Sequence, residues 1–489
     1  MTEWNGDVQR KRWLALMVLC AGVLMIVLDT TIVNVALPSI REDLRFAETA
    51  LVWVVNGYML TFGGFLLLGG RLGDLYGHRK LFLLGITLFT LASLACGLAS
   101  SQGFLIGARA VQGIGGAVVS AVALSLIMDL FTEPGDRAKA MGIYGFVCAG
   151  GGSVGVLLGG VLTSALSWHW IFLVNLPIGV VVYAFCRVLL PDGRGQVSTG
   201  RLDVAGAVTV TAALMLAVYA IVNGNQAGWT SGQSIGLLAA ALVLLLVFIA
   251  IEARVHSPLM PLSLFRLRNV ATANVVGALW AAAMFAWFFI SALYMQLVLG
   301  YSAMQVGLAF LPANLIMAAL SLGLSAKLVM RFGIRVPLAA GLVMAAVGLA
   351  LFARAPVDGT FVVDVLPGMT LLGLGCGIAL NPLLLAAMSD VGPSDSGLAS
   401  GIVNTAFMMG GALGLAVLAS LAAARTDDLL ASGASSVVAL TGGYRAAFVV
   451  GAVFAAAAAL LGAVLVRVRQ PAQAFDQPDA IGASDSART

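Results

Sequence analysis

The chain is poor in charged residues, and this shortage decides its class. Only 10% of its 489 residues are charged, 61% are hydrophobic, and the mean hydropathy is +1.02. A soluble domain carries about 25% charged residues. No soluble core needs so much apolar surface, so we interpret the chain as an all-α polytopic membrane protein that contacts the lipid bilayer. Its basic residues are scattered over many loops, which argues against nucleic acid as a partner.

Residues for metal binding, redox chemistry and catalysis are also scarce. The five cysteines lie inside apolar runs without a Cys-x-x-Cys pair, so we expect neither disulfides nor a metal site. No loop presents a paired acid, a histidine cluster or a nucleophile with its base, which argues against an enzyme. The motif G-x-x-x-x-G-K-[ST] is absent, which argues against ATP-driven transport by this chain. A sensor would need a soluble domain that passes on the signal, and the sequence predicts none. We also expect no cofactor.

Long apolar segments fill most of the chain. Fourteen of them, between residues 13 and 466, are long enough to cross a bilayer, which takes about 17–25 residues. The loops on one side hold 20 of the 26 Lys and Arg residues, and those on the other side hold 5. Because short basic loops stay cytoplasmic, we predict that both termini are cytoplasmic. The first apolar segment has no cleavage site and is interpreted as an uncleaved span.

A weak internal repeat divides the chain into halves. Four residues near position 75 recur 256 positions later, as Leu72, Tyr76, Gly77 and Arg79 and then as Leu328, Phe332, Gly333 and Arg335. Eight spans separate the two copies, which fits two six-helix bundles and a two-helix insert. Repeated halves are typical of secondary transporters, which bind substrate between the halves. We predict a cytoplasmic tail (1–12), an N-terminal bundle (13–190), an insert (204–252), a C-terminal bundle (270–466) and a disordered tail (467–489).

Two ionisable residues lie inside spans. Asp29 is in the first span, where a carboxylate costs roughly 2.5–3.5 kcal/mol and marks an ion pathway. Burial disfavours its charged form, which favours proton exchange. Arg109 is in the fourth span and cannot lose its proton. The two lie in the same outer half of the membrane. We predict a proton-coupling role for both, with Asp29 facing a central cavity; a structural salt bridge is the alternative.

A glycine face and a charged loop are the next candidates. Gly151, Gly155 and Gly159 share one helix face in the fifth span, with Gly160 beside them, and predict either a moving seam or ordinary close packing. Residues 70–80 form a wet hairpin between spans two and three. We expect Asp74 to accept hydrogen bonds there when the cytoplasmic helix ends are together, which makes this loop a conformational latch. Its candidate residues are Gly70, Asp74, Gly77, Arg79 and Lys80.

These motifs resemble the major facilitator superfamily, and specifically its fourteen-span drug:proton antiporters of the QacA/EmrB type. Residues 70–80 are similar to the loop motif G-x-L-x-D-x-x-G-x-[RK]-[RK], and residues 105–113 to the fourth-span motif whose arginine is linked to proton transfer. Residues 28–38 and 168–177 are similar to signatures of the fourteen-span branch, with His169 where arginine is usual. In the fifth-span antiporter motif, Val156 replaces proline, the helix-bending residue associated with export. The match covers nearly the whole chain.

The resemblance implies a proton-coupled exporter of hydrophobic or amphipathic small molecules in the bacterial cytoplasmic membrane, driven by the proton-motive force. A transporter dedicated to one metabolite or self-made antibiotic is the alternative. We expect a monomer. Polar, aromatic and methionine side chains in the spans are candidates to line a permissive cavity, the alternative being contact with lipid or neighbouring helices. They are Asn34, Trp53, Tyr58, Gln112, Trp287, Asn404 and Met408.

Overall fold

The computed structural model describes residues 2–190, 203–255, 258–320, 324–391 and 396–466, and their regular structure is helical. The predicted C-terminal tail, 467–489, lies outside the described residues. The first half of the chain forms α1 (Thr2–Leu44), α2 (Glu48–Tyr76), α3 (His78–Gly97), α4 (Gln102–Leu130), α5 (Pro134–Ala165), α6 (Trp170–Leu173) and α7 (Asn175–Leu189). The segment 2–12, expected to be a tail, is continuous with α1.

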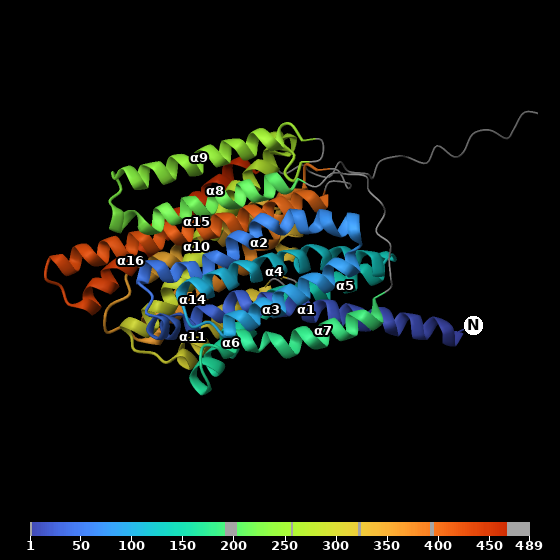
Figure 1. Ribbon diagram of the computed structural model, residues 1–489, viewed down its shortest axis with the longest axis horizontal. Helices are drawn as coiled ribbons and strands as arrows, with labels where there is room; N and C mark the ends of the chain where they lie inside the picture. The colour runs from blue at the N-terminus through green and yellow to red at the C-terminus, as the bar shows by residue number, and fades with distance from the viewer. Residues whose placement is uncertain (1, 191–202, 256–257, 321–323, 392–395, 467–489) are drawn as a thin grey trace, which may run out of the picture.

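The helices that follow form a hairpin and then the second half. The hairpin is α8 (Val204–Ala227) and α9 (Gly232–Glu252). After the short helix η1 (Leu262–Arg266), the second half contains α10 (Arg268–Leu293), η2 (Tyr294–Val298), α11 (Ala303–Ala319), α12 (Ser325–Phe332), α13 (Arg335–Phe352), η4 (Phe361–Val365), α14 (Leu366–Met388), α15 (Ser396–Ala431) and α16 (Ser436–Leu465). Figure 1 shows these helices running roughly along one axis.

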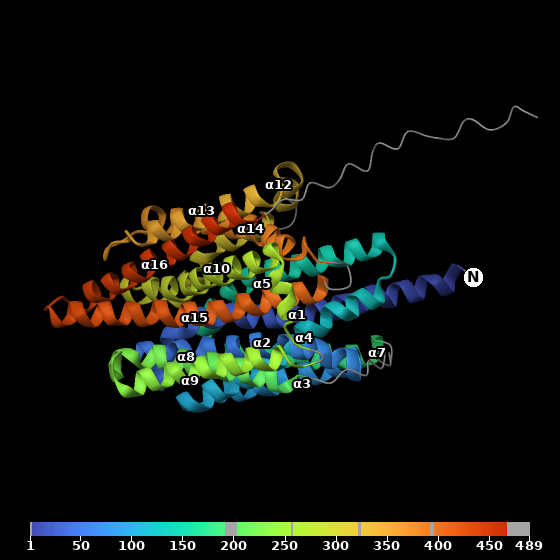
Figure 2. The same ribbon diagram turned by 90° about the horizontal axis from the view of Figure 1, so that it is seen from above.

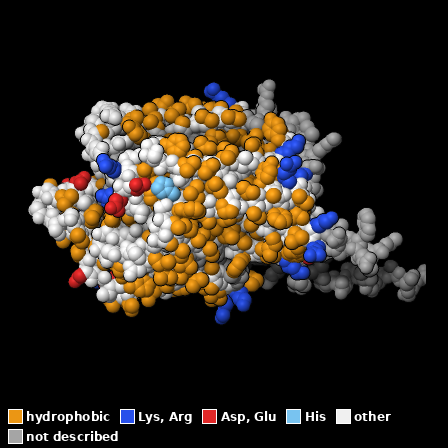
Figure 3. Space-filling view, turned by 60° about the horizontal axis from the view of Figure 1, so that its bottom comes forward, with side chains coloured by type: hydrophobic (Ala, Val, Ile, Leu, Met, Phe, Trp, Pro, Cys, Tyr) orange, Lys and Arg blue, Asp and Glu red, His pale blue; other side chains and the backbone are white. Residues whose placement is uncertain are grey.

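Among the described residues, 12 helices are long and apolar enough to cross a membrane. Two shorter apolar helices, Val154–Ala165 and Ala303–Ala319, lie alongside them. The space-filling view agrees with a membrane protein, because apolar side chains cover the middle of the face shown and Lys and Arg gather mainly at one end (Figure 3). The predicted count of fourteen spans and the cytoplasmic position of both termini stay predictions.

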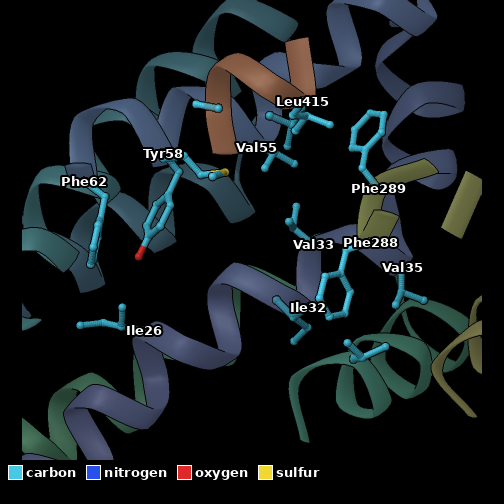
Figure 4. Close-up of a cluster of buried hydrophobic side chains, with 14 of the residues drawn as sticks. Ile26, Ile32, Val33, Val35, Val55, Tyr58, Phe62, Phe288, Phe289 and Leu415 are labelled. Atoms are coloured by element: carbon cyan, nitrogen blue, oxygen red, sulfur yellow. The ribbon is translucent and has the colours of Figure 1, made fainter. Parts of the chain in front are cut away.

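The two halves contact each other along two seams. One seam joins α2 to α15, where the Asn56 side-chain amide donates to the Ala412 carbonyl at 2.9 Å. The other joins α1 and α5 to α10 and α11, and Figure 2 shows α5 beside helices of the second half. Here the Gln296 side-chain amide donates to the Val35 carbonyl at 3.0 Å. Figure 4 shows apolar side chains of α1, α2, α10 and α15 meeting in one buried cluster.

The contacts named for the second seam share one end of the molecule. Val35 is near the C-terminal end of α1, and Gly160, beside Ala303 of α11, is near the C-terminal end of α5. Gly159 lies against Ile32, so these parts of α1 and α5 are at the same end of the bundle. The contacts named here therefore lie at the end remote from the N-terminus of α1.

The helices α8 and α9 differ in how they contact the rest of the protein. α9 packs mainly on α8, and only 17% of its most apolar window is buried. α8 instead contacts both α2 and α15: Thr211 lies against Gly64 of α2, and Asn225 donates to the Ser420 carbonyl of α15 at 2.7 Å. The predicted division into two bundles and an insert stays a prediction.

Candidate functional site

The two ionisable residues predicted from the sequence form a buried ion pair. The Asp29 side chain is 0% exposed and that of Arg109 is 1% exposed. The Arg109 Nη1 donates to Asp29 Oδ2 at 2.5 Å, which joins α1 to α4. Water does not screen this pair as it screens a surface ion pair, and the bond between the two groups is charge-assisted.

Three polar side chains complete the network around Asp29. Gln112 and Asn175 each donate a side-chain N–H to Asp29 Oδ1, at 2.7 and 3.1 Å. The Ser93 hydroxyl accepts from Gln112 at 2.8 Å and donates to the Phe89 carbonyl at 2.8 Å. Asp29 thus accepts hydrogen bonds from three donors on α4 and α7.

Arg109 is fixed on its other sides as well. Its Nε donates to the Val54 carbonyl of α2 at 2.9 Å, and its guanidinium carbon lies 4.5 Å from the centre of the Tyr58 ring. The Phe172 ring is 5.5 Å away on α6. Gly113 permits this arrangement, because a Cβ there would collide with the Tyr58 carbonyl and so prevent the close approach of α4 to α2. Cation–π contact and hydrogen bonds together hold the guanidinium in a dry site.

The network lies inside the first half rather than between the halves. The Asp29 carboxylate faces Arg109, Gln112 and Asn175 and has no exposed surface in this structure. The expectation that Asp29 faces a central cavity is therefore not met in the state described here. The alternative that the sequence left open, a structural partner for a buried cation, matches the contacts equally well.

Residues 70–80 form the sharp connection that was expected between α2 and α3. Gly77 ends α2 with φ 96°, a conformation that favours glycine, and its N–H donates to the Gly73 carbonyl. Asp74 contacts His78 through Oδ1 at 3.2 Å, and the other ring nitrogen of His78 lies 3.0 Å from Asp129 at the end of α4. Each ring nitrogen of His78 faces a carboxylate, which can only accept hydrogen bonds. A neutral imidazole has one N–H and an imidazolium has two, so both contacts are hydrogen bonds only when the imidazole is protonated.

The other loop residues take different places. Arg79 donates to the Arg187 carbonyl of α7 at 2.7 Å, which ties the loop to the end of that helix. Lys80 is exposed, and Gly70 lies beside Ala121 of α4. These partners belong to the first half, so the loop does not bond to the second half through them in this state. The latch role of the loop stays a prediction.

The glycine face of α5 brings two different helices close. Gly151, Gly155 and Gly159 face α1; a Cβ on Gly155 would lie 2.9 Å from the Leu28 carbonyl, and one on Gly159 would lie 2.8 Å from the Ile32 carbonyl. Gly160 faces α11 across the second seam, where its Cβ would lie 2.8 Å from the Ala303 carbonyl. The predicted close packing is present, and one of its contacts joins the two halves.

The candidate cavity residues are scattered rather than gathered around one space. Four of them are buried among neighbouring side chains: Asn34, Tyr58, Gln112 and Trp287. Trp53 lies 6.5 Å from the Tyr219 ring of α8, so it faces the α8–α9 hairpin. Asn404 is exposed, and Met408 is half-buried beside Gly63 of α2. The contacts of Tyr58 and Gln112 place both in the Arg109 network rather than on a cavity wall.

Sequence reasoning missed two members of the network, Ser93 and Asn175. Asn175 lies in the 168–177 signature, and an amide inside an apolar span was the signal that it needs a buried partner. Ser93 gave no such signal, because a serine in a span satisfies its own helix, as it does here through the Phe89 carbonyl. His78 and Asp129 were also missed as partners of the loop.

Comparison with known proteins gives the family. The model of the Major Facilitator Superfamily matches residues 19–415. The cephamycin export protein CmcT of Amycolatopsis lactamdurans is 41% identical over 454 residues, which cover 92% of either chain. The puromycin resistance protein pur8 of Streptomyces alboniger is 39% identical over 460 residues, covering 94% of this chain and 91% of its own.

A solved structure shows the same fold. It is a bacterial homologue of the human lysosomal transporter Spinster in an inward-facing and unoccupied conformation, with a TM-score of 0.64 and 16% identity, covering 93% of this chain and 97% of that one. Its likeness concerns the fold alone. With the family model and the relatives, the apolar helices identify a multi-pass membrane transporter and not an enzyme. The chain belongs to the Major Facilitator Superfamily.

Proposed function

We propose that this transporter exports hydrophobic or amphipathic small molecules in exchange for protons. The observation that carries the proposal is the buried Asp29–Arg109 pair, because an ionisable pair without solvent contact is costly and marks ion pathways in membrane proteins. The proton-motive force is then the energy source. Export, rather than uptake, is supported by the names of the relatives, which are an export protein and a resistance protein.

The geometry suggests how a proton acts. When a proton binds an Asp29 oxygen, the carboxyl becomes neutral and its attraction for Arg109 falls. Arg109 keeps its bonds to the Val54 carbonyl and to Gln112 Oε1, so its charge stays partly compensated while α1 is released from α4. Loss of the proton restores the pair. In this cycle Arg109 stays protonated, and Asp29 is the group that titrates.

Alternating access has a structural counterpart in the second seam. The contacts of α5 with α11 and of α1 with α10 and η2 close one end of the molecule. We infer that this is the outer end, that both termini are cytoplasmic and that the helices make fourteen spans. Val154–Ala165 with the preceding part of α5, and Ala303–Ala319 with α12, then supply the two spans beyond the 12 long apolar helices. On this topology the state described here is inward-facing.

The driving force is adequate for export. A proton that crosses 100 mV supplies about 2.3 kcal/mol. At about 1.4 kcal/mol per tenfold change in concentration, one proton sustains roughly a 40-fold gradient of a neutral substrate.

A second candidate is export of one dedicated antibiotic or metabolite. It is favoured by the two relatives named above, each of which is named after a single antibiotic. Competition separates the two candidates: unrelated dyes and drugs displace one another from a permissive site, whereas a dedicated site rejects all but one compound and its analogues.

Transport into vesicles tests the proposal. Purified protein in liposomes, with an imposed pH gradient, is expected to accumulate a fluorescent amphipathic dye against its gradient, and a protonophore abolishes this. If the transport of every substrate tested is the same with and without the pH gradient, proton coupling is refuted. No dye movement at all, with a well-folded protein and a broad panel that includes cephamycin and puromycin, would refute export of this substrate class.

A further inference from the structure

Two carboxyl groups outside the Asp29 network are buried together beside the α8–α9 hairpin. Asp203 immediately precedes α8 and is 4% exposed, and Glu252 is the last residue of α9 and is 3% exposed. They lie where the hairpin enters and leaves the rest of the fold. Buried carboxyls are costly unless their oxygens are satisfied.

Each carboxyl has one satisfied oxygen and one without a donor. Asp203 Oδ1 accepts from the Gly206 N–H at 2.7 Å, and Glu252 Oε2 accepts from the Met260 N–H at 3.1 Å. The remaining oxygens, Asp203 Oδ2 and Glu252 Oε1, have no hydrogen-bond donor among the described residues. Both approach one point: a Cβ on Gly206 would lie 2.5 Å from the first and 3.0 Å from the second. The two carboxyl groups are therefore in contact beside Gly206.

Two ionised carboxylates cannot make that contact favourable. Both only accept hydrogen bonds, and like charges at this separation repel in a dry site. One proton between them removes a charge and gives both unsatisfied oxygens a partner, as in other paired carboxyls that titrate together. We propose that Asp203 and Glu252 form a second proton-binding site, in which one proton is shared between Asp203 Oδ2 and Glu252 Oε1.

The surroundings favour a proton over a metal ion. Among the described residues, no group of three or more acidic, histidine or cysteine side chains is suited to hold a metal. Hard cations require about six oxygen ligands, whereas a proton requires two. Arg254 is exposed on the turn after Glu252. Arg201 and His256 are charged or titratable neighbours in the sequence and lie outside the described residues.

The shared proton controls a junction between the two halves. Glu252 holds the N–H of Met260 in the segment that leads from α9 to α10. The preceding residue, Leu259, belongs to a buried cluster that includes Leu68 of α2, and Met260 packs against a cluster that includes Met409 of α15. Loss of the proton places two charges in contact, separates the start of α8 from the end of α9 and loosens this segment from both helices. The site therefore couples pH to the α2–α15 seam independently of Asp29.

Infrared difference spectroscopy of the reconstituted full chain tests the site. A protonated carboxyl has a C=O band that ionised carboxylates lack, and the wild type is expected to lose one such band as pH rises. Glu252→Gln and Asp203→Asn keep size and are each expected to remove that band. Glu42→Gln, at an exposed acid of the same type, is expected to leave it unchanged.

A spin label at Leu262→Cys, which is 37% exposed in the segment after Met260, gives a second readout. Its mobility is expected to rise with pH in the wild type and to stay low in Glu252→Gln, where the amide donates to Asp203 at every pH. If neither variant loses the carboxyl band, or if the mobility of the spin label in the wild type does not change with pH, the proposal is overturned. It is also overturned if sodium, potassium or calcium ions shift the titration, because the pair is then a cation site.

Discussion

Replacing Asp29 by asparagine is the sharpest test of the coupling mechanism. Three donors converge on the two oxygens of Asp29: Arg109 on one, and Gln112 with Asn175 on the other. Asparagine offers one oxygen and an NH₂ group. Whichever way its amide turns, at least one donor then faces another donor, and Arg109 loses its counter-charge.

The expected cost follows from these contacts. Removing one partner of a buried ion pair costs about 3–5 kcal/mol, because the other charge stays buried. A buried donor left without an acceptor costs about 1–3 kcal/mol and is included in that figure. We expect Asp29→Asn to stay inserted, since the apolar helices hold the protein in the bilayer, but to melt at a lower temperature in a thermal-shift measurement.

The functional readout is the accumulation ratio in liposomes under an imposed pH gradient. Asp29→Asn cannot titrate, so the ratio is expected to fall from about 40-fold per proton at 100 mV to about one. Exchange of labelled for unlabelled substrate, which needs no proton step, is expected to persist. Asn175→Ala is the matched control: it removes the 3.1 Å hydrogen bond but keeps the carboxylate, so uphill export is expected to persist. Uphill accumulation by Asp29→Asn that responds to the pH gradient would refute the assignment.

Three further substitutions test other parts of the molecule. Arg109→Lys keeps a charge but loses the planar donor pattern, so export is expected to fall at least tenfold; a wild-type pH profile would show that Arg109 is structural only. Gly160→Ala places a Cβ 2.8 Å from the α11 backbone and is expected to cost about 1–3 kcal/mol and slow turnover, whereas Gly152→Ala meets only a 3.7 Å contact and is expected to behave like wild type in the same assay. Asp74→Asn is expected to slow turnover while substrate binding persists, with increased labelling of engineered cysteines near the α2–α3 loop; unchanged labelling with lost turnover would contradict a latch.

The sequence predicted the class of fold and the similar depth of Asp29 and Arg109 for the same reason. In an apolar chain, a lone charge is conspicuous, and counting residues along opposed helices places Asp29 and Arg109 at similar depth. The side-chain amides and the hydroxyl around them are not conspicuous, because a single uncharged polar residue in a span is compatible with many different helix arrangements. The donors of Asp29 come from α4 and α7, and only the packed structure shows that these helices surround α1.

The orientation of side chains was less predictable than their depth. Trp53 and Tyr58 are both aromatic residues of α2, yet one faces Tyr219 of α8 and the other faces Arg109. Nearly every face of α2 is covered by another helix, so apolar periodicity does not distinguish a helix neighbour from a cavity. The glycine pattern in α5 predicted close approach correctly but not which helix approaches: Gly159 meets α1 and Gly160 meets α11.

The contacts of α8 with both halves restrict substitutions in α8 more than in α9. One edge of α8 is fitted to α2 at Thr211, and another is fitted to α15 through Asn225 and the Ile221 carbonyl, which accepts from Ser420 at 3.1 Å. A substitution on either edge must suit a helix that belongs to a different half. α9 does not have to fit two helices from different halves, because most of its surface is covered by neither half. Its sequence is free to drift among apolar residues, so homologous chains should diverge in α9 long before they diverge in α8.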